Sequence, residues 1–486
     1  MAVTDIKHVF VLMLENRSYD HLLGALSLSG VGIDGAPTVA DGIAAGAFTN
    51  SDASGNSYAN SYGGDPTAGL PADPPHEYDD VVRQLLGDNQ DPPYNYSVSP
   101  INLSGFVRSY AAEAGAAPLG AVLQSLPDGA VPNLATLGRQ YCVCDRWFSS
   151  LPGPTVPNRF FLTAATSGGN PKSPSGFRLG SADLFDSFKF INGNIFKRIK
   201  ERTSLSHRIY RGDSLPFSSL LESVDYDQDT VAFTAAGFAA DCNRPNLPNF
   251  VLIEPNYDIF DGFRNGNSMH PLGNVQRGDQ LIKEVYDGIS QSACWGQSLF
   301  IITFDEHGGF FDHVIPPKAT APGDVPDVYD FHFTQLGVRV PAVVVSPLLA
   351  QSNLIDHTVY DHTSMLATLA EVFPELGALG SFTMRDRLAN SLSHLFAGPA
   401  AAARPPVALV EHARPAAALA PPPAVDHGPL GHAEVAGLRI AAALHYRLLK
   451  GKRHDISARL NAIANKGEAR AYVQQVEAHL KLRPGQ

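Results

Sequence analysis

Four short apolar runs constrain the fold of this chain more than any other feature of its sequence. No charged residue interrupts them, and they cover Val9–Leu14, Phe250–Ile253, Leu299–Phe304 and Val340–Val345. Such continuous runs are typical of strands that are buried on both faces of a parallel sheet. Segments with helical periodicity lie between them, over Asn133–Tyr141, Pro157–Ala165, Val275–Ser290 and Thr363–Val372. Strands that alternate with helices favour an α/β fold with a mostly parallel sheet.

Composition excludes several classes of protein. The 486 residues include 36 Lys and Arg against 48 Asp and Glu, a formal net charge of −12. An acidic chain is poorly suited to nucleic acid, because neutralising phosphates requires clustered Lys and Arg. No apolar stretch approaches the roughly 18 residues that a membrane span needs. The four cysteines include the close neighbours Cys142 and Cys144, which argues against a scaffold built on disulfides.

The start of the chain bears on its compartment. The first predicted strand begins near Ile6, which leaves no room for an export signal. We therefore expect a cytoplasmic protein by default.

The chain divides by composition into three parts. Residues 1–396 carry the apolar runs and form the predicted catalytic domain, within which Ser27–Pro100 and Ser167–Asn249 resemble long surface insertions. Residues 397–431 form an Ala/Pro-rich, semi-rigid linker. Residues 432–486 form a helical tail with ten Lys and Arg against four Asp and Glu, a net charge of +6. Two roles are open for this tail: docking on the acidic catalytic domain, or peripheral contact with an anionic membrane or a partner.

Polar residues stand where two of the predicted strands end. Glu15 and Asn16 follow the first strand, and Asp305 and Glu306 follow the third. Ligands of open α/β sheets bind beyond the carboxyl ends of the strands, so these four side chains can converge. Carboxylate and amide oxygens suit a hard divalent cation. The alternative is that each acid caps a helix or pairs with an arginine.

A third segment, "PGPTVPNRFFLTAATSGG" from Pro152, predicts a stiff turn that leads into a helix. Thr155 is placed like an N-cap, and Pro157 suits the first turn. A phosphate held at this N-terminus would meet backbone N–H groups and the positive end of the helix dipole. Thr155 Oγ1 would then lie beside the phosphorus, as a nucleophile does. The simpler interpretation, that Thr155 only caps the helix, stays open.

Several histidines supply chemistry that a phosphate site needs. They are His76 in "DPPHEYDD", His270 in "NSMHPLG", His307 and His313 after the predicted strand that ends at Asp305, and His362 in "YDHTS". A single loop histidine is more often solvent-exposed than catalytic. A site for a phosphate dianion nevertheless needs a cationic clamp and a leaving-group acid, and histidine provides both near neutral pH.

Together these motifs resemble a known family. The stretches "IKHVFVLMLENRSYDHLLG", "LPGPTVPNRFFL", "HPLGNVQRGDQL" and "FIITFDEHGGFFDHVIPP" are similar to the bacterial phosphoesterase family that includes nonspecific phospholipases C and certain acid phosphatases. The similarity spans about residues 6 to 395. It implies an α/β/α sandwich of the alkaline phosphatase superfamily. Members of the family are often exported, which conflicts with the expected cytoplasmic location.

The resemblance also assigns roles to individual residues. It implies metal ligands at Glu15, Asn16, Asp305 and Glu306. Thr155 matches the nucleophile, and His76 and His270 match histidines around the substrate phosphate. Two positions depart from the family pattern: Met269 stands where an acidic residue is common, and His207 stands where an aromatic residue is expected to form a pocket wall.

We therefore expect a metal-dependent phosphoesterase that works through a covalent phosphothreonine. Thr155 matches the phospholipase C branch, which favours phosphodiesters such as phospholipid headgroups. One alternative is an acid phosphatase that acts on monoesters. Another, of a different class, is a catalytically silent binding protein that is recruited by its basic tail. The sequence leaves open which divalent metal is bound, how many, and the oligomeric state.

Overall fold

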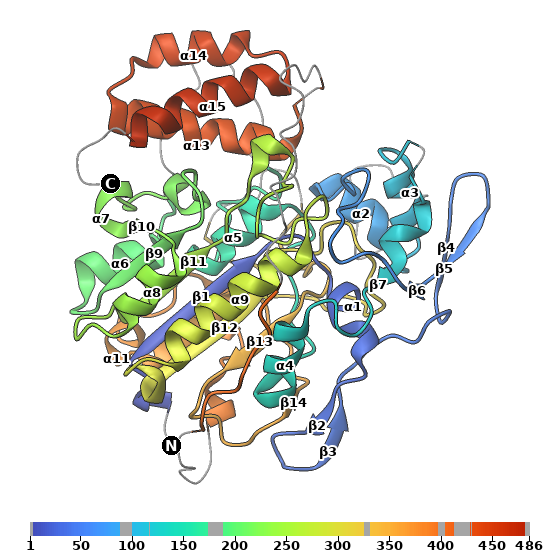
Figure 1. Cartoon of the computed structure of the whole chain (residues 1–486), viewed down its shortest axis with the longest axis horizontal. Helices are drawn as coiled ribbons and strands as arrows, with labels where there is room; N and C mark the ends of the chain where they lie inside the picture. The colour runs from blue at the N-terminus through green and yellow to red at the C-terminus, as the bar shows by residue number, and fades with distance from the viewer. Residues whose placement is uncertain are drawn as a thin grey trace.

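A ten-stranded sheet forms the centre of the computed structural model, which describes residues 3–87, 100–115, 117–173, 188–324, 331–396, 404–412, 428 and 430–481 (Figure 1). The strand order is β10-β9-β11-β1-β12-β13-β8-β14-β2-β3. In chain order the bounds are β1 His8–Leu14, β2 Ser29–Val31, β3 Pro37–Val39, β8 Cys142–Cys144, β9 His207–Arg211, β10 Thr230–Ala232, β11 Phe250–Glu254, β12 Ser298–Phe304, β13 Ala342–Val345 and β14 Leu354–Asp356. This mixed α/β architecture with a mostly parallel sheet confirms the predicted fold class.

The centre of the sheet is the pair β1 and β12, which run parallel with Leu14 opposite Phe304. Strand β11 lies parallel to β1 on its other side. All seven residues of β12 are buried, which requires helices on both faces of the sheet. The predicted runs at Val9–Leu14, Phe250–Ile253 and Leu299–Phe304 therefore form central strands whose carboxyl ends meet at one edge.

Two features of the sheet differ from the sequence prediction. The run predicted at Val340–Val345 does form β13, but it is antiparallel to both β12 and β8. A continuous apolar run indicates that a strand is buried on both faces. It does not indicate whether the strand is parallel or antiparallel to its neighbours. The segment Ser167–Asn249, interpreted as a surface insertion, contributes β9 and β10 to the main sheet. Its strand "HRIYR" was missed because it is rich in charge.

The helices of the catalytic part follow the predicted periodicity closely. Two predicted helices have the same bounds in the structure, α9 Val275–Ser290 and α10 Thr363–Val372. The others in the two helical layers are α4 Pro132–Gln140, α5 Thr155–Ala164, α6 Ile195–Arg202 and α8 Ala235–Cys242. Helix α9 lies in front of the sheet in Figure 1 and runs roughly along the direction of β1. The insertion between Ser27 and Pro100 forms the outer strands β2 and β3, the small strands β4 Thr49–Ser51, β5 Ser57–Ala59 and β6 Ser61–Tyr62, and helix α2 Tyr78–Leu86.

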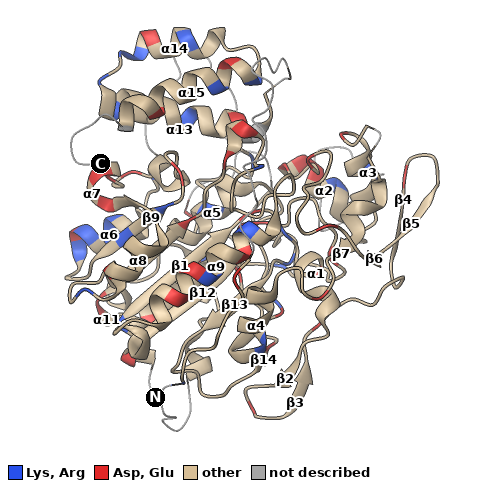
Figure 2. Cartoon of the chain, viewed as in Figure 1, with Lys and Arg blue, Asp and Glu red and all other residues tan. Residues whose placement is uncertain are grey.

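The C-terminal helices pack on the catalytic part in Figure 1. They are α13 His432–Leu449, α14 Arg453–Ala462 and α15 Lys466–Lys481. Their basic residues lie on all three helices (Figure 2). Most of the predicted linker 397–431 lies outside the described residues, but Val410 is held by reciprocal hydrogen bonds with Asn133. The division into catalytic domain, linker and tail stays a prediction. None of the described helices is both long and apolar enough to cross a bilayer.

A buried arginine joins the segments that flank the sheet edge. Arg339, which is fully buried, donates to Asp20 at 2.9 Å and to Asp312 at 3.1 Å. It also donates to the carbonyl oxygens of Asp41 and Asp145. Carboxylates at this depth are tolerated only when they are paired and hydrogen-bonded.

We predict that Arg339→Ala lowers the free energy of unfolding by about 3–5 kcal/mol, because it removes the buried guanidinium that pairs with the carboxylates of Asp20 and Asp312. Urea denaturation followed by circular dichroism measures the change. Arg139→Ala is the matched control: its pair with Asp128 at 3.2 Å is exposed, so the loss should stay below about 1 kcal/mol. Equal losses in the two variants would contradict the prediction.

Candidate active site

The candidate site lies where β1 and β12 end side by side. The backbone N–H of Asn16 donates to Asp305 Oδ1 at 3.0 Å, which joins the two strand ends directly. Asn16 adopts a left-handed backbone, with φ 60°, and this turns its amide away from the strand direction. Gly308 supports this turn, since a Cβ there would lie 2.2 Å from the carbonyl oxygen of Asn16. The predicted convergence of the two strand ends is therefore present.

The amide of Asn16 points its oxygen at other oxygens. Asn16 Oδ1 lies 2.6 Å from Glu306 Oε1 and 3.3 Å from Asp305 Oδ1. Rotation of the amide would place Nδ2 there, where it would donate to both carboxylates. The orientation with oxygen inward is favourable when a cation sits among these oxygens, and the rotated orientation is favourable when none does.

Burial and mutual repulsion perturb the acids of the cluster. Burial, followed by the charge of Asp305, raises the pKa of Glu15 to about 8. Burial also raises the pKa of Asp305 to about 6, against the lowering effect of Arg159. Glu15 Oε2 is buried and has no hydrogen-bond partner. An orphaned carboxylate oxygen beside other carboxylates is the type of donor that a hard divalent cation takes, so the chemistry of the four predicted ligands suits such an ion. Among the described residues, however, Glu15, Asp305 and Glu306 do not form one of the groups whose ligand atoms all lie close enough together to share an ion. Their role as ligands stays a prediction.

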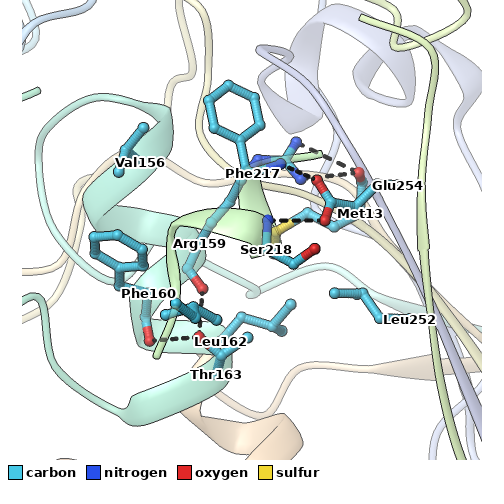
Figure 3. Close-up of a pocket in the computed structure, with 11 residues that line it drawn as sticks. Met13, Val156, Arg159, Phe160, Leu162, Thr163, Phe217, Ser218, Leu252 and Glu254 are labelled. Carbon is cyan, nitrogen blue, oxygen red and sulfur yellow. Dashed lines mark hydrogen bonds between the residues drawn. The ribbon is translucent and has the colours of Figure 1, made fainter. Parts of the chain in front are cut away.

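An arginine that the sequence analysis assigned no role lies at the centre of the site. Arg159 donates through Nε to Asp305 Oδ2 at 3.1 Å and through Nη2 to the Leu14 carbonyl at 3.1 Å. Its guanidinium lies 5.2 Å from the ring centre of Tyr257 and 5.4 Å from that of Phe217. Figure 3 shows Arg159 reaching from α5 toward Met13, with Phe217 beside its guanidinium. The available signal was its spacing, four residues after Thr155 on one helix face.

Thr155 is the first residue of helix α5, and Pro154 occupies the N-cap position. The helix has no side-chain capping bond, so the interpretation of Thr155 as a cap is wrong. Its hydroxyl instead donates to Asn16 Oδ1 at 3.3 Å. Proline at the N-cap leaves no side-chain acceptor for the N–H groups of the first turn, which then point toward the cluster with the positive end of the helix dipole.

The two predicted histidines lie together on the other side of Asn16. His76 Nδ1 donates to the Pro74 carbonyl at 2.7 Å, and its Nε2 lies 3.3 Å from Asn16 Nδ2. Burial lowers the pKa of His76, but Glu306 and Asp73 outweigh it and raise that pKa to about 10. The ring centroid of His270 lies 6.2 Å from that of His76.

His270 is held in one tautomer. Its Nδ1 accepts from the Leu272 backbone N–H at 3.3 Å, so Nε2 carries the proton and faces Asp73 Oδ2 at 3.6 Å. Burial lowers the pKa of His270 well below its usual value, which keeps the ring neutral. Asp73 was not singled out from the sequence, although it stands three residues before His76. The group Asp73, His76 and His270 is compact enough to hold a metal ion.

Two other histidines position the acidic strand end. His362 donates from Nε2 to the Asp305 carbonyl at 2.7 Å, while its Nδ1 accepts from the Trp147 indole at 3.3 Å. Burial lowers the pKa of His362 to about 4, so it acts as a neutral hydrogen-bonding group. His307 lies 2.7 Å from Gln84 Oε1 and 3.2 Å from Glu306 Oε2. His313 contacts Asp20 at 2.7 Å, in the network around the buried arginine of the fold.

His207 and Met269, the two positions that depart from the family pattern, lie in different parts of the structure. His207, which stands where an aromatic residue is usual in the family, pairs with Phe250 at the amino end of its strand, next to Asp229. Met269 lies in the site loop with φ 71°, and its carbonyl accepts from Arg17 Nε at 2.6 Å. Arg17 Nη2 also donates to the His270 carbonyl at 3.0 Å, so this arginine fixes the backbone that carries the histidine.

Comparisons with known proteins find similar sequences along most of the chain. The family model described as "Phosphoesterase family" matches residues 6–374. Non-specific phospholipase C3 of Arabidopsis thaliana is 31% identical over 409 residues, which cover 80% of this chain and 73% of the relative. Phospholipase C B of Mycobacterium tuberculosis (strain CDC 1551 / Oshkosh) is 26% identical over 426 residues, which cover 79% and 77%.

The solved structures that match are less similar to this chain than these sequence relatives are. A protein of the alkaline phosphatase superfamily from Vibrio parahaemolyticus is 15% identical, with a TM-score of 0.30, and the match covers 51% of this chain and 60% of that one. The phosphonate monoester hydrolase of Agrobacterium radiobacter is 12% identical, with a TM-score of 0.33, over 56% and 74%.

We predict that the full-length protein binds a divalent cation through the acidic strand ends, and that Asp305→Ala lowers the metal content of the purified chain. The cation compensates the repulsion among the buried carboxylates, which a chelator restores. Metal analysis by mass spectrometry before and after dialysis against chelator measures the occupancy. Asp128→Ala, which removes a mostly exposed carboxylate, is the control and should keep its metal. Equal metal content in the wild type and the Asp305 variant would exclude this site.

Proposed function

The chain belongs to the Phosphoesterase family, and we propose that it is a phospholipase C-type hydrolase that cleaves phosphodiesters such as phospholipid headgroups through a covalent phosphothreonine. The observation that carries the proposal is the position of Thr155. Its hydroxyl is the first polar group of α5, and it points at the amide oxygen of Asn16 within the acidic cluster. A hydroxyl at the positive end of a helix dipole is well placed to attack a phosphate bound there.

The residues around Thr155 fit the parts of an in-line displacement. A substrate phosphate at the start of α5 would meet the backbone N–H groups of the first turn, the Nε2–H of His270 and the charged ring of His76. A divalent cation bound by Glu15, Asn16, Asp305 and Glu306 would supply positive charge beside the nucleophile and the phosphate oxygens. Arg159 fixes Asp305 and the end of β1, which keeps the acidic groups in place.

The reaction then follows in two stages. In the first, the Thr155 hydroxyl loses its proton to solvent, and Oγ1 bonds to phosphorus as the bond to the leaving alcohol breaks. His76, protonated at Nε2, donates a proton to that alcohol. In the second, water attacks the phosphothreonine and gives one proton back to His76. The bond from phosphorus to Thr155 Oγ1 breaks, Oγ1 takes a proton from solvent to regenerate the hydroxyl, and a phosphomonoester is released. Stabilisation of the charge on the phosphate by preorganised donors is the main contribution of the chain.

The names of the relatives favour phosphodiesters as the substrates, since the relatives compared are named phospholipases C. The acid phosphatase alternative predicts turnover of monoesters. Comparison of p-nitrophenylphosphorylcholine with p-nitrophenyl phosphate separates the two. Hydrolysis of neither substrate would favour the binding protein. Salt-sensitive binding of anionic vesicles would add membrane contact through the basic tail.

We predict that Thr155→Ala folds normally and loses on the order of a thousandfold or more in kcat, as removal of a covalent nucleophile does. Thr155→Ser should keep partial activity, because it retains a hydroxyl. Steady-state turnover of the two p-nitrophenyl substrates measures the loss. Thr163→Ala, on the same helix, is the control: its hydroxyl bonds only the backbone of Arg159 and Phe160, and it should keep near wild-type turnover. Near-normal rates in the Thr155→Ala variant would show that the nucleophile lies elsewhere.

A further inference from the structure

The segment 255–270, which joins β11 to the start of α9 and carries His270, has a strained backbone. Asp258, Phe263 and Met269 are non-glycine residues with φ of 56°, 62° and 71°. Such conformations are uncommon outside glycine, and they persist only where the surrounding structure enforces them. The segment therefore needs contacts beyond its own hydrogen bonds.

This segment sets the position of two groups in the candidate site. The ring of Phe263 stacks on His270 with centroids 3.5 Å apart and planes 7° from parallel. Tyr257 lies against the guanidinium of Arg159 and donates its hydroxyl to Glu254 at 2.8 Å. A shift of the segment would move the imidazole of His270 and would release one face of Arg159.

The C-terminal helices hold the same segment from outside. Arg470 of α15 donates from Nε to the Phe260 carbonyl at 2.7 Å, and the same atom lies 3.1 Å from Asp261 Oδ1. The Arg470 side chain is only 11% exposed. On α13, Gly437 packs against the ring of Phe260 so closely that a Cβ would lie 2.7 Å from it. Figure 1 shows α13 and α15 above this part of the chain.

A second hydrogen bond joins the C-terminal helices to the segment that packs on the other face of Arg159. Arg447 of α13 donates from Nη1 to the Ser219 carbonyl at 3.0 Å. Ser219 lies in the short helix Phe217–Leu220, and Phe217 is the other ring against the guanidinium of Arg159. Both aromatic partners of Arg159 therefore stand on segments that the C-terminal helices hold.

We propose that the C-terminal helices are part of the catalytic unit, and that Arg470 is a positioning residue that holds segment 255–270 so that His270 keeps its place on the ring of Phe263. The inference rests on the proposed function, because it assumes that His270 acts on the substrate phosphate. It assigns to the basic tail a role inside the enzyme, in addition to any contact with other molecules.

The test compares Arg470→Ala with Arg459→Ala in the full-length protein. Arg459 also lies in the tail, and its side chain contacts Gln475 and Tyr472 within it. We expect Arg470→Ala to lower kcat on p-nitrophenylphosphorylcholine by about tenfold to a hundredfold, with a smaller change in KM, because a misplaced catalytic group costs transition-state stabilisation. Arg470→Lys should recover part of the rate. Arg459→Ala should behave like the wild type.

Hydrogen exchange gives a readout that does not depend on activity. The amide of Phe263 donates to the Asp258 carbonyl, and the amide of Asn267 donates to the Asn256 carbonyl. We expect peptides that contain these amides to exchange faster in Arg470→Ala, and to be unchanged in Arg459→Ala. Arg470→Met, which keeps the aliphatic stem, repeats the measurement if the alanine variant does not fold.

The outcomes separate this inference from the proposed function. Unchanged exchange in segment 255–270 together with unchanged kcat would overturn the inference. Faster exchange spread over the whole chain would also overturn it, since the tail would then contribute only to general stability. If the wild type hydrolyses neither p-nitrophenyl substrate, the proposed function fails, and the exchange of the segment still decides whether Arg470 holds it.

Discussion

The buried ion pair between Arg159 and Asp305 is the interaction on which the rest of the site depends. It connects helix α5, which presents Thr155, to the end of β12, and through the Leu14 carbonyl to the end of β1. Burial of an ion pair loses more hydration free energy than the attraction between its charges restores, unless every remaining donor is hydrogen-bonded. Here the guanidinium donates hydrogen bonds to a carboxylate and to two carbonyl groups at the strand end, and its faces lie against two aromatic rings. The pair therefore fixes the geometry of the site more than it adds to stability.

Around this pair the structure arranges charges that would repel one another. Glu15, Asp305 and Glu306 lie beside the amide of Asn16, which in its rotated orientation donates to Asp305 and Glu306. Neutral histidines support them: His362 fixes the carbonyl of Asp305, and the tautomer of His270 leaves its proton facing Asp73. The arrangement is costly without a cation and favourable with one, which is the energetic reason to expect a metal at this edge of the sheet.

The C-terminal helices change how the chain is divided into parts. Composition separates a basic tail from an acidic body, yet the buried residues of α13 and α15 belong to one apolar core with the strands of the sheet. Arg470 and Arg447 reach the two segments that enclose Arg159, and Lys466 pairs with the buried Glu434 at 2.6 Å. Part of the positive charge of the tail is thus used within the molecule, which leaves fewer basic residues for an anionic surface.

The sequence by itself determined the fold class and the composition of the acidic cluster. Apolar runs without charges encode burial on both faces, and the polar residues directly after them follow the strands to one sheet edge, so Glu15, Asn16, Asp305 and Glu306 could be grouped without coordinates. Only the tertiary structure decided the antiparallel direction of β13, the place of His207 at the far end of β9, and the contact of Thr155 with Asn16 in place of a cap. It also decided the roles of Arg159, Asp73 and Arg470, because each acts across more than one hundred residues of chain or between loops whose course no periodic pattern describes. Local sequence encodes periodicity and burial, whereas the partners of a buried charge are fixed by how the chain returns to the same point in space.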